Sequence, residues 1–159
     1  MPDVRRLRAP GKTGLVAPGA ILLAAALLLL ASCTSGGGGA PATPEPPATP
    51  QDGVLTVRAF EWGFAPESIA LRRGEPVRIV FQNDGKIFHN LKIEELAADA
   101  IESRSTGPLS ADEGELFVGA DGGEQGELSF VPQESGAFVF YCTVGDHRQR
   151  GMEGTLRVE

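Results

Sequence analysis

The feature that most constrains this chain is a short C-terminal loop that carries three side chains able to bind a soft metal ion. Cys142, His147 and Met152 follow one another at the spacing Cys-x4-His-x4-Met. A thiolate and a thioether suit Cu(I), and imidazole suits copper in either oxidation state. A second imidazole can come only from His89, because the chain has two histidines. We therefore predict that these four side chains hold one mononuclear type 1 (blue) copper ion, with the methionine as a weak axial ligand.

The rare residue types of the chain are concentrated in this set. Apart from Met1 and Cys33, every His, Cys and Met of the sequence belongs to it. Each of these residues alone has a plainer interpretation, since a lone Cys or Met more often packs a core. Zinc is the rival metal, but structural zinc sites pair Cys or His at closer spacing and do not use Met. Copper is therefore the cofactor that the pattern favours.

The first 32 residues have the layout of an export signal. Four basic residues precede an unbroken run of eleven Ala, Ile and Leu residues at positions 20–30. This run is too short to span a bilayer, which needs about 20 residues, and it is typical of a signal peptide. It ends in Leu-Ala-Ser followed by Cys33, which resembles a bacterial lipobox, so we predict a diacylglycerol on the Cys33 thiol. The alternative is an ordinary signal peptide with a chance cysteine.

The sequence predicts three parts: a lipoprotein signal peptide at 1–32, a lipidated Gly/Pro-rich tether at 33–52 and one domain at 53–159. Gly-rich and Pro-rich segments cannot bury a core and act as linkers. Ten basic and twenty acidic residues remain after residue 32, a formal charge of −10. This charge argues against nucleic acid as a partner and against electrostatic membrane binding. We expect an exported protein, held on the cell membrane by its lipid and facing the periplasm or the exterior.

The predicted domain consists of short segments rich in β-formers, separated by turns. We predict strands at residues 54–60, 68–71, 76–81, 88–93, 127–131, 137–141 and 154–158, with a turn at 83–85. Short strands at this spacing indicate an all-β sandwich or barrel. Residues 94–103 carry helix formers at helical spacing and predict one short helix. Residues 106–123 are rich in Gly, Asp and Ser and predict a loop.

Three segments resemble the small blue copper proteins known as cupredoxins. The stretch YCTVGDHRQRGMEGTLRV is similar to the copper loop of auracyanin, rusticyanin and sulfocyanin, more than to that of plastocyanin, whose Cys–His gap is shorter. The pattern F-x-W-G-F-x-P-x-x-I-x-L-x-x-G-x-x-V at 60–77 and the triplet Phe-His-Asn at 88–90 also resemble this family. The resemblance implies a cupredoxin-like Greek-key β-sandwich. It also implies that Asn90 forms a clasp onto Thr143 that orients the ligands, and we expect Trp62 to pack near the site.

The resemblance further implies a one-electron carrier at the outer face of the membrane, and not an enzyme. Multicopper oxidases and nitrite reductases need further histidines, and a binuclear copper centre needs a second Cys in the loop. Redox partners would be proteins such as a c-type cytochrome or a membrane oxidoreductase. The alternative is an extracytoplasmic copper-binding or copper-delivery protein, although the chain lacks the Met-rich or His-rich segments of many carriers. A third reading is a domain that serves only as an interaction module.

The loop sequence also predicts where electrons enter and leave. We expect the ring edge of His147 to reach the surface and His89 to be buried, because apolar residues surround His89 in the sequence. A small docking patch of Val144, Gly145 and Met152, together with Gly151, would then surround His147.

The lipid anchor can be tested by replacing the cysteine. Cys33→Ala should leave the precursor uncleaved at the membrane, because the lipoprotein peptidase acts only after the thiol is lipidated. Metabolic labelling with a fatty acid and the gel mobility of the precursor measure this. Release of mature Cys33→Ala protein at the wild-type rate would contradict the lipobox reading.

Overall fold

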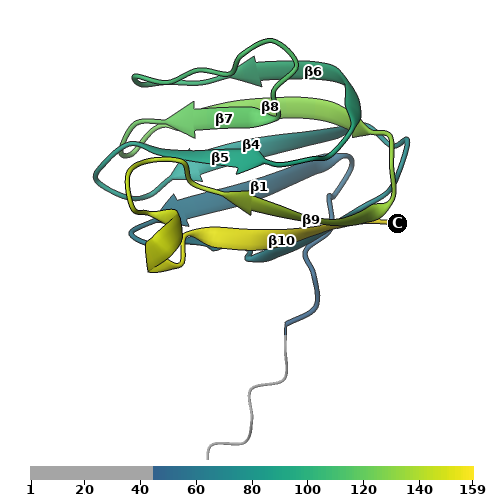
Figure 1. The fold of residues 1–159 in the computed structure, drawn as a ribbon, viewed down its shortest axis with the longest axis horizontal. Coiled ribbons are helices and arrows are strands. Elements are labelled where there is room, and N and C mark those ends of the chain that lie inside the picture. Colours follow the sequence, from purple (N-terminus) through teal and green to yellow (C-terminus); the bar gives the residue numbers. More distant parts are fainter. Residues whose placement is uncertain (1–44) are drawn as a thin grey trace, which may run out of the picture. The chain divides into compact units, whose positions relative to one another are not determined.

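The computed structural model describes residues 45–159, which form two β-sheets packed face to face (Figure 1). The predicted signal peptide, Cys33 and the tether up to residue 44 lie outside the described residues. Among residues 45–159, no helix is long and apolar enough to cross a membrane.

Each sheet has five strands. The first sheet consists of β1 (Val54–Phe60), β2 (Gly63–Ala65), β4 (Val77–Asn83), β6 (Ala98–Arg104) and β8 (Gln125–Pro132), in the order β2-β1-β4-β8-β6. The second consists of β3 (Ser68–Leu71), β5 (His89–Ile93), β7 (Phe117–Ala120), β9 (Gly136–Tyr141) and β10 (Glu153–Val158), in the order β3-β10-β9-β5-β7. The pairs β1–β4 and β3–β10 are parallel, and the others are antiparallel. The predicted all-β sandwich is thus confirmed, and all seven predicted strands are present with ends shifted by at most two residues.

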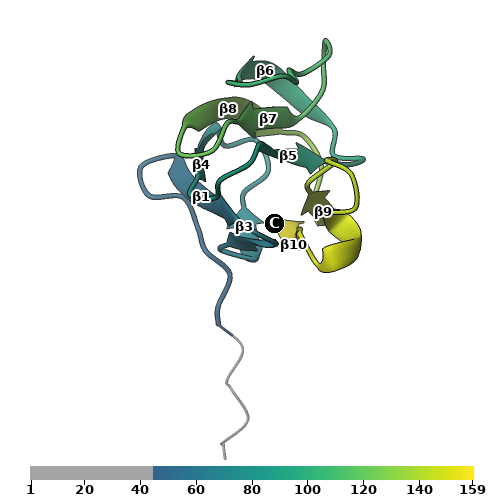
Figure 2. The same cartoon turned by 90° about the vertical axis from the view of Figure 1, so that its left-hand side faces the viewer.

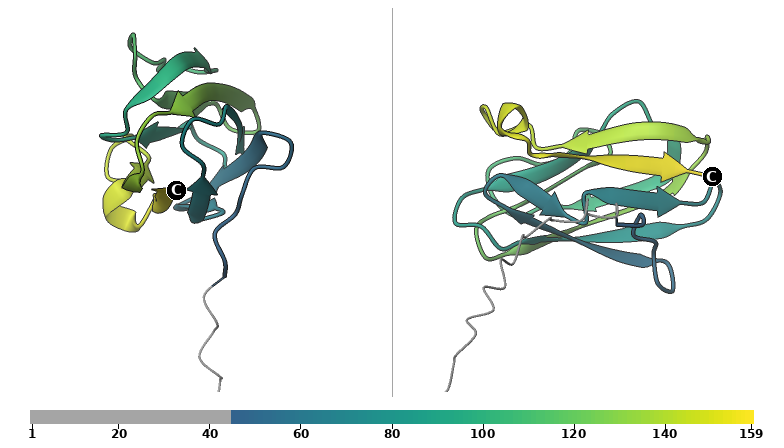
Figure 3. Two further views of the ribbon diagram at one scale, coloured as in Figure 1. Left: turned by 90° about the vertical axis from the view of Figure 1, so that its right-hand side faces the viewer. Right: turned by 90° about the horizontal axis from the view of Figure 1, so that it is seen from below.

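The core lies between the sheets because the strands alternate between buried and exposed residues. In β1 and β10 every second residue is buried, as expected for strands with one face on a core. Four phenylalanines, Phe64, Phe81, Phe130 and Phe140, are almost wholly buried and contribute from both sheets. The end-on views in Figure 2 and in the left panel of Figure 3 show the sheets curving around this shared interior.

The short helix predicted at residues 94–103 is wrong, because this segment leads into strand β6 and forms most of it. Strand β6 lies at the edge of the first sheet and pairs with β8, with a bulge between Asp99 and Glu102. Only Ala98 and Ile101 of this strand pack against the core. An edge strand with so little buried surface carries no clear alternation in its sequence, so pairing with β8 overrides the helix propensity of its residues.

The loop predicted at residues 106–123 contains a strand that the sequence did not indicate. Strand β7 pairs antiparallel with β5, with His89 opposite Ala120, and all four of its residues are buried. A Cβ at Gly119 would lie 2.6 Å from the Phe88 ring, so a larger residue there would displace the ring. A four-residue strand that contains glycine resembles a turn in sequence, which explains the error.

The described end of the predicted tether lies along the edge of the second sheet. The backbone N–H of Ala48 donates to Ser68 (2.9 Å), and Ala48 accepts from the N–H of Ala70 (2.9 Å). Gln51 forms a bridge with Val54. These contacts begin before residue 53, and the three-part division of the chain stays a prediction.

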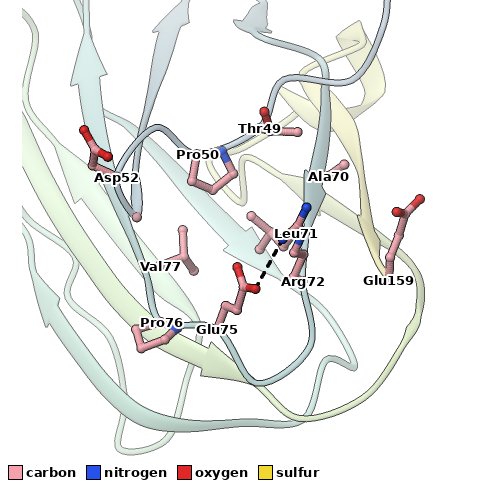
Figure 4. A pocket seen from close by; sticks show the side chains of 11 residues that line it. Thr49, Pro50, Asp52, Ala70, Leu71, Arg72, Glu75, Pro76, Val77 and Glu159 are labelled. Carbon is pink, nitrogen blue, oxygen red and sulfur yellow. Dashed lines mark ion pairs between the residues drawn. The ribbon is translucent and has the colours of Figure 1, made fainter.

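A depression lies near the C-terminus (Figure 4). The C-terminus is at the opposite end of the sandwich from residues 142–152, which we call the ligand loop (Figure 1). Strand β10 leads from that loop towards Glu159, and its six residues span about 20 Å at roughly 3.3 Å each. The depression is lined by carboxylates and apolar side chains, with an ion pair between Arg72 and Glu75 (3.5 Å). It offers no imidazole or thiol, so the metal centre lies at the other end.

The turn that leads from β4 to β5 is held by one wholly buried amide, Asn83. Its Nδ2 donates to the carbonyls of Ile87 (2.8 Å) and Ala120 (2.9 Å). Its Oδ1 accepts from the N–H of Gly85 (2.9 Å). The last residue of β4 thus fixes the segment that delivers His89 to the site.

Replacing this amide should destabilise the fold. Asn83→Ala leaves several buried backbone groups without partners, and we expect the free energy of unfolding to fall by about 2–4 kcal/mol. Urea unfolding of the metal-free protein measures this without any contribution from the metal. Gln82→Ala is the matched control, since Gln82 makes one long hydrogen bond (3.3 Å) near the surface. Equal losses in the two variants would contradict the account.

Candidate metal centre

Three of the four predicted ligands meet at one end of the sandwich. His89 begins β5, Cys142 directly follows β9, and His147 directly precedes the short 3-10 helix η1 (Arg148–Arg150). Their donor atoms all lie within 4.8 Å of one another, and all three residues are buried. Residues that are 53 positions apart in the chain are therefore brought together by the pairing of strands.

The spacing of the donor atoms suits a single metal ion. The Cys142 Sγ lies 3.4 Å from Nδ1 of His147 and 4.0 Å from Nδ1 of His89. Ligand atoms that bind one ion at about 2.0–2.3 Å and at near-trigonal or tetrahedral angles are roughly 3.3–3.9 Å apart. The observed distances are close to this range, so two imidazoles and a thiolate fit one ion with little rearrangement. This donor set is the one expected for copper.

The fourth predicted ligand, Met152, is tied to the other two residues of the loop through its backbone. Its N–H donates to the His147 carbonyl (3.1 Å), and its carbonyl accepts from the Cys142 N–H (3.1 Å). The Met152 side chain is wholly buried. Gly151, with φ of 100°, closes η1 by donating to Arg148 (2.9 Å). This left-handed conformation favours glycine and turns the chain so that Met152 returns to the site.

The position of His89 relative to Cys142 follows from the pairing of β5 with β9. The backbone ladder contains Ile93 opposite Phe140 and Lys92 opposite Tyr141, and the strands then separate. Two residues further towards the site, the side chain of Asn90 bridges the gap to Thr143. Its Oδ1 accepts from the Thr143 N–H (2.8 Å), and its Nδ2 donates to the Thr143 hydroxyl (2.9 Å). The clasp implied by the family resemblance is therefore present, and it continues the ladder where the backbone pairing ends.

The electrostatic environment prepares the imidazoles for metal binding. Burial lowers the pKa of His89, and the neighbouring His147 lowers it further. Burial also lowers the pKa of His147. Neutral imidazole is the form that binds a metal. Burial raises the pKa of the Cys142 thiol, and the backbone N–H groups of Asn90 and Val144 oppose this effect. Metal binding at neutral pH would therefore displace a thiol proton.

The side chain of His147 reaches the surface to a much smaller extent than expected. Its side chain is covered by Trp62, whose ring centroid lies 4.7 Å from that of His147, and only 5% of His147 is exposed. The guanidinium of Arg150 lies 4.5 Å from the Trp62 ring centroid and pairs with Asp146 (2.8 Å). Met152 is also buried, so it cannot belong to the surface patch predicted around His147.

The packing of Trp62 and Arg150 near His147 could be predicted only in part from the sequence. The position of Trp62 near the site was expected, and the structure confirms it. The sequence carries no signal that the loop between β1 and β2 folds over the ligand loop. The contribution of Arg150 was missed because an arginine flanking a loop histidine usually points to solvent.

The Asn90 clasp should control how tightly copper is held. Asn90→Ala removes both hydrogen bonds to Thr143 and frees the Cys142 segment from β5. We expect copper affinity to fall about 10–100-fold, as is usual when groups that orient metal ligands are lost. Competition with a chelator measures the affinity. Thr143→Val is the matched control because it removes the hydroxyl but keeps the backbone bond to Asn90, and a loss as large as that of Asn90→Ala would contradict this role.

Comparisons with known proteins agree with this reading of the site. A protein named copper-resistant cuproprotein CopI, from Rubrivivax gelatinosus, is 35% identical over 115 residues, which cover 70% of this chain and 68% of that protein. Reduced auracyanin of Roseiflexus castenholzii superposes with a TM-score of 0.53 at 20% identity, over 67% of this chain and 97% of its own. A multicopper oxidase of Campylobacter jejuni superposes with a TM-score of 0.50 at 14% identity, over 74% of this chain and 31% of its own. These two structural similarities show the fold alone.

A further comparison assigns the chain to a protein family. The family model for copper binding proteins of the plastocyanin/azurin family matches residues 52–159 of this chain. This range contains the whole two-sheet fold and the buried His–Cys–His cluster. The predicted copper-binding sandwich is therefore confirmed, and the chain belongs to the plastocyanin/azurin family of copper-binding proteins, with one mononuclear copper ion as its cofactor.

Proposed function

We propose that this protein is a type 1 copper protein that carries single electrons outside the cytoplasmic membrane. His89, Cys142 and His147 are its principal ligands, and Met152 is a weak axial ligand. The observation that carries the proposal is the buried His–Cys–His cluster, whose donor atoms all lie within 4.8 Å of one another. When bound there, copper supplies a site that accepts and gives up one electron.

Rigidity is what an electron carrier requires of the protein around its metal. Cu(II) and Cu(I) prefer different coordination, so a site that rearranges little exchanges electrons fastest. Here the ladder between β5 and β9 and the Asn90–Thr143 clasp hold His89 and Cys142 in place. Backbone hydrogen bonds from Met152 fix the other end of the loop. These contacts favour a single geometry for both oxidation states.

The same features argue against catalysis. Both histidines of the sequence lie in this one centre, so no imidazole remains for a second copper centre of the oxidase type. All three ligands are buried, which argues against access of a substrate to the ion. The similarity to a multicopper oxidase is limited to the fold, so it does not bear on whether this protein is an enzyme.

A role in copper handling is the second candidate, and the name of the Rubrivivax relative favours it. Delivery of copper requires an incoming ligand to reach the ion. Trp62 packs against His147, Arg150 lies over the Trp62 ring, and His89 and Met152 are wholly buried. We therefore favour retention of the ion with electron exchange over transfer of the ion.

The partner and the location follow from charge and from the predicted export signal. We propose an extracytoplasmic protein, lipid-anchored through Cys33, whose anionic surface attracts a basic redox protein such as a c-type cytochrome. The charged side chains that influence the pKa of His147 are those of Asp146, Arg150 and Glu61. Electrons would pass through Trp62, because its ring packs on His147 and is partly exposed.

The decisive experiment is to load purified mature protein with Cu(II) and record its visible spectrum and voltammetry. We expect an intense thiolate-to-copper charge-transfer band and a reversible one-electron wave, both lost in Cys142→Ser. Transfer of Cu(I) to a chelator should be slow in the wild-type protein and faster in Trp62→Ala. A Cys142→Ser variant that keeps the band would remove this thiol from the site. Fast copper transfer without reversible cycling would favour copper handling instead.

A further inference from the structure

One ring nitrogen of His89 has no partner in the described structure. Its Nδ1 faces the Cys142 sulfur at 4.0 Å. Its Nε2, on the other side of the ring, is buried and makes no hydrogen bond to any described residue. When Nδ1 binds a metal, the neutral imidazole carries its proton on Nε2. The loaded site would therefore hold a buried N–H donor that needs an acceptor.

A charged acceptor lies close to this nitrogen, since Oε1 of Glu61 is 4.0 Å from Nε2. Glu61 directly precedes Trp62, so one short connection between β1 and β2 brings side chains to both histidines. The separation is too long for a hydrogen bond, which needs about 2.7–3.2 Å. A closure of roughly 1 Å would form it.

The carboxylate is fixed by contacts that do not involve His89. Its Oε1 accepts from the backbone N–H of Lys86 at 2.7 Å. The carboxylate occupies the space beside Gly85, where a Cβ would lie 2.8 Å from Oε1. The Lys86 N–H also lowers the pKa of Glu61, so the group is charged at neutral pH. The turn that precedes His89 thus holds a carboxylate against the back of that imidazole.

We propose that Glu61 is a positioning residue for His89: its carboxylate accepts the Nε2–H hydrogen bond in the copper protein and thereby lowers the reduction potential. This inference rests on the proposed function, because it requires His89 to bind copper through Nδ1. An anionic acceptor makes the imidazole a stronger donor. Stronger donation stabilises Cu(II) more than Cu(I), so the reduction potential falls.

A purely structural role for Glu61 predicts a different outcome. If the carboxylate only stabilises the turn at Lys86, then Gln at position 61 should serve equally well, since its Oε1 can accept the same backbone N–H. If the charge acts on His89, then Gln should keep the turn but change the electronic properties of the copper site. Glu61→Gln therefore separates the two roles.

The test compares the reduction potentials of copper-loaded wild-type protein, Glu61→Gln and Glu124→Gln. Glu124→Gln makes the same change in net charge, and the Glu124 side chain has no hydrogen bond or ion pair to the described residues. We expect Glu61→Gln to change the ratio of Cu(I) to Cu(II) affinity about tenfold, which raises the potential by about 59 mV for one electron. The reduction potential of the control variant Glu124→Gln should shift by less than a third of this amount. Equal shifts in the two variants would overturn the proposal.

A second measurement keeps the test valid if Glu61→Gln folds poorly. In the nitrogen-15 NMR spectrum of the Cu(I) protein, the Nε2–H proton of His89 should be shifted downfield and should exchange slowly with solvent. Absence of this signal in the wild-type protein would overturn the inference. Failure of the proposed function has another signature, since the wild-type protein would then lack the charge-transfer band and the reversible wave.

Discussion

The pairing of β5 with β9 is the constraint on which the copper centre depends. It brings the start of one strand beside the end of the other, so that His89 and Cys142 face the same space. The ladder stops before the site, and the Asn90–Thr143 clasp keeps the separated strands at a fixed distance. A metal site needs room between its ligands, and a continuous backbone ladder would close that room. The side-chain clasp provides rigidity without closing it.

The connection between β1 and β2 gives the centre a second set of contacts from the other sheet. Trp62 packs against His147, and Glu61 lies behind His89. One of these neighbouring residues packs against the ring of the outer histidine, and the other places a charge near the inner one. Exclusion of water strengthens electrostatic effects, because the local dielectric constant falls. The packing of Trp62 therefore strengthens the effect of the Glu61 charge. It also makes the site more enclosed than the sequence of the ligand loop indicates.

Local patterns were reliable where burial imposes a period on the sequence. Strands β1 and β10 alternate between buried and exposed residues, and the residue types follow this alternation. The prediction failed for β6, whose pairing depends on a neighbouring strand rather than on its own side chains. It failed also for β7, where Gly119 reads as a loop residue but lies against the Phe88 ring. In both cases the information lies in a partner that is remote in sequence.

The sequence by itself determined the ligand chemistry, since the chain offers one set of two imidazoles, a thiol and a thioether, and it determined the sandwich through alternation. It also indicated the Asn90–Thr143 clasp through family resemblance. Only the tertiary structure decided which groups surround the ligands. Trp62 packs against His147 with Arg150 over its ring, and Glu61 lies beside His89. The physical reason is that ligand identity is a property of residue type and spacing. Exposure and local charge depend instead on how separate loops pack, which no single segment encodes.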